Sequence, residues 1–221
     1  MPSRAVTEAA APDAIAIEAV TADRLPDLAT LFGSNKTTAG CYCMWFLVPA
    51  KECSAGWNGG NRVAFEAATG AAAEPMGLLA FRDGEPIGWC AAGPRTRYAR
   101  ALRSPVLAAR DADARVWLVP CFYVRRDARR SGVTRALLEA AVALARTHRA
   151  TAIEGFPLGG DKRRGTGDAF VGVEPLFASC GFTVVDRPTS SRVVMRRELS
   201  RRGSPGRKLT TRPVKGAVAG R

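Results

Sequence analysis

Several features of other protein classes are missing from this 221-residue sequence. It contains no apolar run of the roughly 18 residues that a membrane-spanning helix requires, so we expect no such helix. Residues 1–12 include several alanines and one arginine, but not the long apolar core of a secretory signal peptide. We therefore expect residues 1–13 to be a disordered leader and the protein to be cytoplasmic.

Metal-ligating residues are also sparse. His148 is the only histidine, and the six cysteines are scattered along the chain. Cys41 and Cys43 are separated by a single residue, one fewer than in the usual zinc-binding pair, and no second pair follows. The sequence therefore argues against a metal site. Without a secretory signal, the cysteines are expected to be reduced thiols.

Acidic residues are outnumbered, because 20 Asp and Glu stand against 33 Lys and Arg, a formal net charge of +13. Residues 201–221 contain no acidic residue, and their Arg, Ser, Gly, Pro and Thr predict a basic disordered tail over residues 200–221. Clustered basic residues bind nucleic acid weakly through its phosphates, but this tail lacks aromatic residues for stacking on bases. A solvated tail and a weak nucleic-acid contact both remain open.

Residues 14–199 alternate strand-like and helix-like stretches, which predicts one α/β (α+β) domain with a mixed sheet flanked by helices. Pro120 lies inside an apolar run and predicts a bulge in that strand. Residues 33–60 are rich in Gly, Cys and aromatic residues and are expected to be irregular. The expected strands are residues 14–20, 76–82, 86–92, 116–124, 151–156, 182–185 and 192–197, and the expected helices are residues 21–32, 61–69, 95–102, 135–148 and 173–179.

The most informative segment joins the strand 116–124 to the helix 135–148. It is short and basic, with four arginines between residues 125 and 130 and a single glycine, Gly132. The first N–H groups of a helix have no partner within the helix and carry partial positive charge, so this geometry favours a phosphate. The segment lacks the Gly-Lys-Ser/Thr of a Walker A loop and the three glycines of a dinucleotide-binding fingerprint.

A strand ending at Val124 and the following Arg-Arg-Ser-Gly-Val-Thr of residues 129–134 resemble the cofactor loop of the GNAT superfamily of N-acetyltransferases. Thr134 departs from the family pattern, which prefers glycine or alanine there, but it still offers a backbone N–H. The hairpin at residues 78–92 and the Leu-Phe-Ala-Ser-Cys-Gly-Phe of residues 176–182 also match the family. The resemblance implies a mixed, mostly antiparallel sheet with a central splayed pair of parallel strands, flanked by helices.

The resemblance also implies acetyl-CoA as co-substrate, without a metal. Its pantetheine arm would lie along the strand 116–124 like an added strand, and its pyrophosphate would bind the loop. The bulge expected at Pro120 suits this arrangement, because the family separates two parallel strands to admit that arm. The cofactor-binding residues implied are Phe122, Tyr123, Val124, Arg129, Arg130, Ser131, Gly132, Val133 and Thr134.

The activity implied is direct transfer of an acetyl group to a primary amine, on a small molecule or a protein lysine, by a monomer or homodimer. Such transfer needs removal of a proton from the amine and protonation or stabilisation of the thiolate that leaves. Family members often use a tyrosine of the late helix as the acid, and Phe177 stands at that position here. Tyr123 is the substitute candidate, although a strand tyrosine is commonly a packing residue. The missing tyrosine keeps open a catalytically silent acyl-CoA-binding or regulatory domain.

Glu154 is the first candidate for the catalytic base. It interrupts the apolar strand 152–156 beside the expected separation of the parallel strands, where a carboxylate would be partly desolvated. The alternative is a carboxylate paired with an arginine, and both interpretations remain open. Asp168 and Glu174 are weaker candidates.

A second unusual segment contains Cys41, Cys43 and Trp45. It resembles the substrate side of a GNAT subgroup, in which Cys and Trp line the acceptor pocket. Together with Trp57, its aromatic residues can form an apolar wall for the acceptor. An aromatic mini-core beneath a loop is the other interpretation, and neither identifies a substrate.

Overall fold

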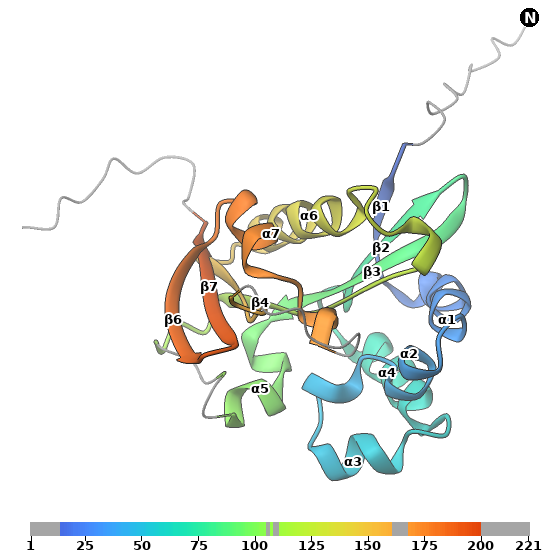
Figure 1. The fold of residues 1–221 in the computed structure, drawn as a ribbon. Coiled ribbons are helices and arrows are strands. Elements are labelled where there is room, and N and C mark those ends of the chain that lie inside the picture. Colours follow the sequence, from blue (N-terminus) through green and yellow to red (C-terminus); the bar gives the residue numbers. More distant parts are fainter. Residues whose placement is uncertain (1–13, 105–106, 108–110, 161–167, 200–221) are drawn as a thin grey trace, which may run out of the picture.

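The structure of the protein is a computed structural model that describes residues 14–104, 107, 111–160 and 168–199. The predicted leader and basic tail lie outside the described residues. In the described part, a seven-stranded sheet has the order β1-β2-β3-β4-β5-β7-β6, shown in Figure 1. The strands are β1 (Ala16–Ala19), β2 (Gly77–Arg82), β3 (Glu85–Pro94), β4 (Val116–Val124), β5 (Ala152–Gly155), β6 (Thr183–Thr189) and β7 (Arg192–Glu198).

The sheet is mixed, with one parallel pair at its centre. β4 and β5 run parallel, whereas the other neighbouring strands pair antiparallel. The parallel pairing joins residues 116–119 of β4 to residues 152–155 of β5 and stops there, although β4 continues to Val124. The predicted architecture, a mostly antiparallel sheet with a splayed central pair, is confirmed.

The bulge predicted at Pro120 is present in β4. Ala91 of β3 pairs with Cys121, but Gly93, two residues later, pairs with Leu118, three residues earlier in β4. One extra residue of β4 is therefore inserted at this point, as in a β-bulge. Pro120 has no backbone N–H to contribute to a ladder, which makes this strand position a tolerable one for it.

The bulge also reverses which residues of β4 face each side of the sheet. Val119 and Phe122, three positions apart, both join the core cluster beneath helix α6 (Val133–Thr147). Cys121 and Tyr123 instead join the cluster on the opposite face. An undisturbed strand would place residues two apart on one face, so the bulge decides which side chains reach the opposite face.

Helices cover both faces of the sheet (Figure 1). α6 lies on one face and buries a stripe whose members are three or four residues apart, including Leu137, Ala141 and Ala145. The other face is covered by α1 (Leu25–Gly33), α2 (Lys36–Cys41), α3 (Ala50–Ala55) and α4 (Gly60–Ala71). The remaining α-helices of the described residues are α5 (Ala99–Arg103) and α7 (Glu174–Ser179), and the 3-10 helices are η1 (Ala22–Arg24), η2 (Met44–Phe46), η3 (Arg95–Arg97), η4 (Arg126–Ala128) and η5 (Asp168–Val171).

The expectation that residues 33–60 are irregular is wrong, because α2, η2 and α3 lie within them. These helices are short, and contacts distant in sequence hold them. The side-chain amide of Asn61 donates to the carbonyl oxygens of Gly40 and Cys53, at 2.8 Å each. The Trp57 indole packs against Gly40 so closely that a Cβ there would lie 2.2 Å from it. Helices of one to two turns give too little periodicity to be recognised in sequence.

In the described part of the chain, no helix has the length and apolarity needed to cross a bilayer.

Candidate active site

The loop between β4 and α6 forms a cradle of backbone N–H groups. Arg130 and Gly132 have positive φ angles of 65° and 82°, on either side of Ser131. Alternating backbone conformations of this kind turn successive N–H groups toward a common anion. Among the described residues, none accepts a hydrogen bond from the backbone N–H groups of residues 130–135. The loop therefore keeps its donors and the positive end of the α6 dipole for an anion.

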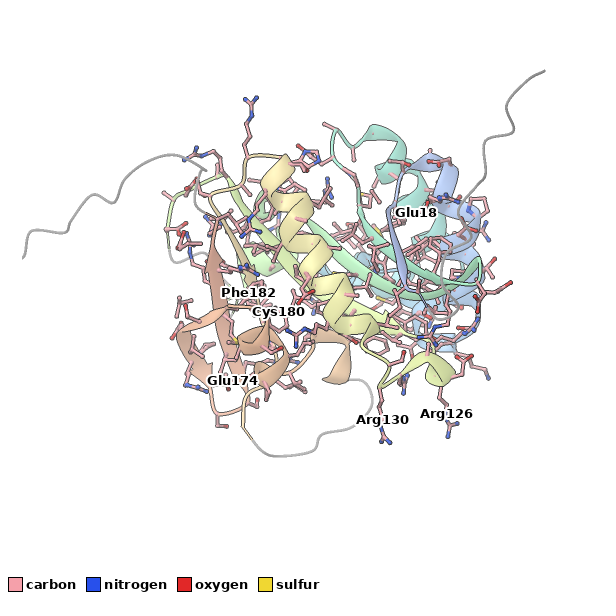
Figure 2. All side chains as sticks on the ribbon, turned by 90° about the horizontal axis from the view of Figure 1, so that it is seen from above. Glu18, Arg126, Arg130, Glu174, Cys180 and Phe182 are labelled. Atoms are coloured by element: carbon pink, nitrogen blue, oxygen red, sulfur yellow. The ribbon has the colours of Figure 1, made fainter. Side chains whose placement is uncertain are left out.

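Two side-chain hydrogen bonds hold the loop, and two of its arginines are exposed. Ser131 Oγ donates to the Ala128 carbonyl at 2.8 Å, and Arg129 Nε donates to the Val124 carbonyl at 3.1 Å. Arg126 and Arg130 are exposed and extend away from the ribbon in Figure 2. The loop thus holds two arginine side chains in solvent, where their charge is available to an anionic ligand.

Arg82, the last residue of β2, contacts the β4–α6 loop, and the sequence analysis did not identify it. Its guanidinium donates to Ser131 Oγ at 2.9 Å. Its Nε is buried and has no hydrogen-bond partner within the described residues. An unpaired buried donor is costly, which suits a site that an anion completes. Arg82 lies 49 residues before Ser131, so only the β2–β3 hairpin brings it to the loop.

On the other face of β4 lies a cavity of about 350 Å³, near the small end of the range for small-molecule sites. It is enclosed by β3, β4, α1, α2, η2, η5 and β7, together with Trp57. The lining residues are Phe32, Thr37, Thr38, Cys41, Cys43, Trp45, Phe46, Trp57, Trp89, Cys121, Tyr123, Phe170, Val171 and Arg192.

Of the predicted catalytic and cofactor-binding residues, Tyr123 is the one that lines this cavity. Its hydroxyl lies 2.9 Å from Ser34 Oγ, and Ser34 Oγ lies 2.6 Å from the Leu31 carbonyl. A carbonyl can only accept, so Ser34 donates its proton to Leu31 and Tyr123 is the donor to Ser34. The Tyr123 ring stacks on Phe170 with a centroid distance of 6.2 Å. The hydroxyl is therefore held in one orientation at the cavity wall.

The thiols of the Cys41–Cys43 segment line the same cavity. Tyr42 and Cys43 both have positive φ angles, 44° and 58°. The Trp89 indole N–H donates to Cys43 Sγ at 3.2 Å. Hydrogen bonds from Cys121 and, less strongly, Trp89 lower the pKa of the Cys43 thiol, whereas burial raises the pKa of Cys41 to about 12. Cys43 is thus the thiol of this wall that ionises most readily.

The aromatic residues of this segment divide between the cavity and the core. Trp45 and Trp57 line the cavity and are each 41% exposed. The Arg100 guanidinium lies 3.6 Å from the centre of the Trp45 ring, a cation–π contact that fixes the indole. Tyr42 instead packs into the core, with its ring edge against Phe32.

Glu154 is buried, but it does not line the cavity. Its carboxylate accepts a hydrogen bond from Arg196 at 2.8 Å and faces Arg95 at 3.8 Å. Arg95 also binds the Asp111 carboxylate, and this bond lowers the pKa of Asp111. Burial disfavours the charge on Arg196, but its bonds to carboxylates, including Glu154, outweigh that effect and raise its pKa. Glu154 therefore belongs to a network of ion pairs that joins β5 to β7 and to Arg95 of η3.

The two weaker base candidates are Glu174 and Asp168. Glu174 forms an ion pair with Arg187 at 2.6 Å, at the start of α7. Asp168 is the first residue of η5, the short helix whose Phe170 lines the cavity. Glu174 is labelled in Figure 2 on the side of α7 and β6.

Phe177 lies where β4 and β5 separate. A Cβ on Gly155, the last residue of β5, would be 2.2 Å from the Phe177 ring. The same ring contacts Phe122 of β4 edge-on at a centroid distance of 6.1 Å. Phe177 is fully buried, so an apolar ring without a hydroxyl fills this position.

The described residues contain no group of three or more His, Cys, Asp or Glu that could hold a metal ion. His148 follows the end of α6 and lies against Trp117, with a distance of 5.2 Å between ring centroids.

The sequence matches the model of the acetyltransferase (GNAT) family over residues 43–156. The structure of yncA from Salmonella typhimurium with its cofactor acetyl-CoA is similar, with a TM-score of 0.51 and 16% identity over 88% of this chain and 99% of that one. An N-acetyltransferase from Staphylococcus aureus gives a TM-score of 0.50 and 12% identity over 85% and 100% of the two chains. These two likenesses show a shared fold. A search of curated proteins finds no match.

Proposed function

Because this chain belongs to the acetyltransferase (GNAT) family, we propose that it transfers the acetyl group of acetyl-CoA to a primary amine by direct attack of that amine. Family membership makes the chain an acyltransferase. Acetyl-CoA as the donor is further supported by the similar yncA structure, which holds it as cofactor. An activated thioester supplies the reaction with an acyl carbonyl and a good leaving group.

The β4–α6 loop carries this proposal. Its backbone N–H groups at residues 130–135 have no acceptor among the described residues, and Arg82 Nε is a buried donor without a partner. Arg126 and Arg130 add charge at the rim. These groups fit a pyrophosphate, which offers several acceptor oxygens and two negative charges at one place. Thr134 lies in the first turn of α6 and contributes a backbone N–H to the same cradle.

The free edge of β4 beyond the bulge suits an extended arm. Past residue 119, β4 is paired with β3 but no longer with β5. Backbone groups on an unpaired strand edge bind an extended chain as an added strand would. We propose that the backbone around Phe122 and Val124 binds the pantetheine arm, which brings the thioester to the bulge beside Cys121 and Tyr123.

Tyr123 is our candidate for the acid that protonates the leaving thiolate. Its hydroxyl lines the cavity and has a fixed orientation through Ser34. Glu154 is bound to arginines and does not line the cavity, which supports its interpretation as a paired carboxylate over that as a base. Phe177 offers no hydroxyl, so Tyr123 is the remaining candidate of the two positions considered.

The role of the loop in acetyl-CoA binding is tested by substituting two glycines that have nearly the same backbone conformation. Gly132 in the loop and Gly84 in the β2–β3 turn have φ angles of 82° and 80°, and neither has an atom within 4 Å of an added Cβ. Gly132→Ala and Gly84→Ala therefore strain the backbone equally. We expect Gly132→Ala alone to weaken acetyl-CoA binding, by about tenfold or about 1.4 kcal/mol, in titration calorimetry. Equal affinities for the two variants would contradict the loop assignment.

Activity is tested by release of CoA thiol in the presence of a panel of primary amines. Release that depends on the amine is the expected result. Tight acetyl-CoA binding without any such release would favour the catalytically silent domain, for which the apolar Phe177 is the one supporting feature.

A further inference from the structure

The cavity beside Tyr123 is lined mainly by aromatic rings and thiols. Among the described residues that line it, no Asp or Glu side chain occurs, and Arg192 is the charged one. The titratable groups that face it are Cys41 and Cys43 from the α2–η2 segment, Cys121 and Tyr123 from β4, and Arg192 from β7. Burial holds the Cys41 thiol neutral, with a pKa of about 12. Apart from Cys43, whose pKa is lowered, the described wall therefore offers a cation little compensation for the water it would lose.

An alkylamine is protonated at neutral pH and must lose a proton before it can attack. Cys43 is the group of the described wall with a lowered pKa, but its sulfur is buried and already accepts hydrogen bonds from Trp89 and Cys121. Tyr123 donates its own proton to Ser34, whose proton goes to the Leu31 carbonyl, so the chain of hydrogen bonds ends at a group that cannot pass a proton on. Glu154 is bound to Arg196 away from the cavity. An acceptor that is already neutral avoids both difficulties.

An aromatic amine has these properties. Its nitrogen lone pair is delocalised into the ring, so the amine is uncharged at neutral pH. Its planar ring also suits the cavity mouth, where Trp45 and Trp57 are each 41% exposed. Arg100 holds the Trp45 ring, and Gly40 lets the Trp57 indole approach closely. Both walls are preformed, which lowers the entropic cost of binding a flat ligand.

We propose that the acceptor is a small, uncharged aromatic amine that binds with its ring near Trp45 and Trp57 and its nitrogen toward Tyr123. This inference rests on the proposed acetyl transfer and names the class of its substrate. The amine nitrogen forms a bond to the acetyl carbon and the carbon–sulfur bond breaks. The proton lost from the nitrogen balances the proton that the CoA thiolate takes up.

The test compares amines of equal size that differ in protonation. Aniline and cyclohexylamine, and the same pair bearing a methyl group opposite the nitrogen, are supplied with acetyl-CoA, and release of CoA thiol is followed between pH 6 and pH 9. We expect kcat/KM for the aromatic amine to exceed that for its saturated partner by at least tenfold at pH 7. The ratio of the two should fall about tenfold per pH unit as the pH rises, because the neutral fraction of the alkylamine grows. Titration of Cys43 affects both amines and cancels in this ratio.

A binding measurement separates the cavity from the chemistry. Trp57 is half exposed, so Trp57→Ala should fold. In calorimetry with CoA present, Trp57→Ala should weaken aniline binding by about fivefold, and Trp57→Phe should restore most of the affinity, since the aromatic face is what binds. Val63→Ala, at a residue 67% exposed and outside the cavity, is the control and should leave binding unchanged.

Each outcome decides a different point. A saturated amine that is acetylated as fast as its aromatic partner at pH 7 overturns the substrate class while leaving acetyl transfer intact. Aromatic-amine binding that is equal in wild type and Trp57→Ala overturns the placement of the ring. Acetyl-CoA binding without transfer to any amine overturns the proposed function, and the substrate class with it.

Discussion

The two sides of β4 differ in how their chemistry is built. The loop that follows Val124 draws its N–H donors and most of its charge from one contiguous segment, residues 125–134. The cavity beside Cys121 and Tyr123 is assembled from segments between Phe32 and Arg192, and its described wall is apolar. A loop suited to an anion can form within one segment, because neighbouring backbone N–H groups supply the donors. An apolar cavity needs segments that are far apart in the sequence and that only the whole fold brings together.

A catalytic role for Glu154 would add a carboxylate to the chemistry of the cavity. Glu154→Gln removes the buried carboxylate that faces Arg95 and Arg196, and the side chains of Glu154 and Arg95 are only 3% and 5% exposed. The more exposed Asp111 still pairs with both arginines and limits the loss. We expect the free energy of unfolding to fall by about 3 kcal/mol, the low end for breaking a buried pair. Urea denaturation measures this loss, and kcat well below the melting temperature should stay near the wild-type value. A tenfold loss of kcat with unchanged stability would instead identify Glu154 as the base.

Tyr123→Phe tests whether the cavity supplies the general acid. Removal of the hydroxyl should lower kcat about a hundredfold, at the low end for losing a general acid, because the leaving thiolate then receives no proton from the wall. Affinity for acetyl-CoA should be unchanged, since the loop is intact. Ser34→Ala removes the partner of this hydroxyl, together with the bond from Ser34 to the Leu31 carbonyl, and should have a smaller effect on kcat. Wild-type kcat in Tyr123→Phe would exclude the role of acid.

Binding of acetyl-CoA by the β4–α6 loop should depend on the charge of its arginines and therefore on salt concentration. Arg126→Gln combined with Arg130→Gln should weaken acetyl-CoA binding about tenfold, because two charge-assisted contacts are lost. The matched control is Arg146→Gln, an exposed arginine in the last turn of α6. Titration calorimetry at low and high salt should show a smaller salt dependence for the double variant than for either wild type or the control. Equal salt dependence in all three proteins contradicts the role of these arginines.

The smallest expected effect concerns the cavity thiols. Cys41 and Cys43 line the same cavity, but the pKa of Cys43 is lowered and that of Cys41 is raised to about 12. Thiolate is the reactive form, so lowering the pH should suppress alkylation of Cys43 less than that of Cys41. Mass spectrometry after brief iodoacetamide treatment at several pH values should find a labelling rate that changes less with pH for Cys43 than for Cys41. Comparing each thiol with itself removes their difference in exposure. An equally steep pH dependence for both thiols would contradict the lowered pKa of Cys43.

The sequence was reliable where local chemistry decides the structure. The strand 116–124, the helix that follows, the bulge at Pro120 and the hairpin around residues 83–84 are all present. It failed at residues 33–60, where the short helices depend on hydrogen bonds from Asn61 to carbonyl groups 8 and 21 residues earlier in the chain. It also missed Arg82, because residues far apart in sequence carry no local signal of their proximity.

The fold class and the loop that we propose binds an anion were predictable from the sequence alone, because periodicity, turn residues and helix-start geometry act over a few residues. Only the tertiary structure decided the faces of β4, where one extra residue turns Tyr123 toward the cavity and Phe122 toward α6. It also decided the partners of Glu154, since Arg95 and Arg196 come from segments on either side of β5 in the sequence. The physical reason is that burial and side-chain pairing depend on which strands become neighbours, and strand order is a property of the whole fold.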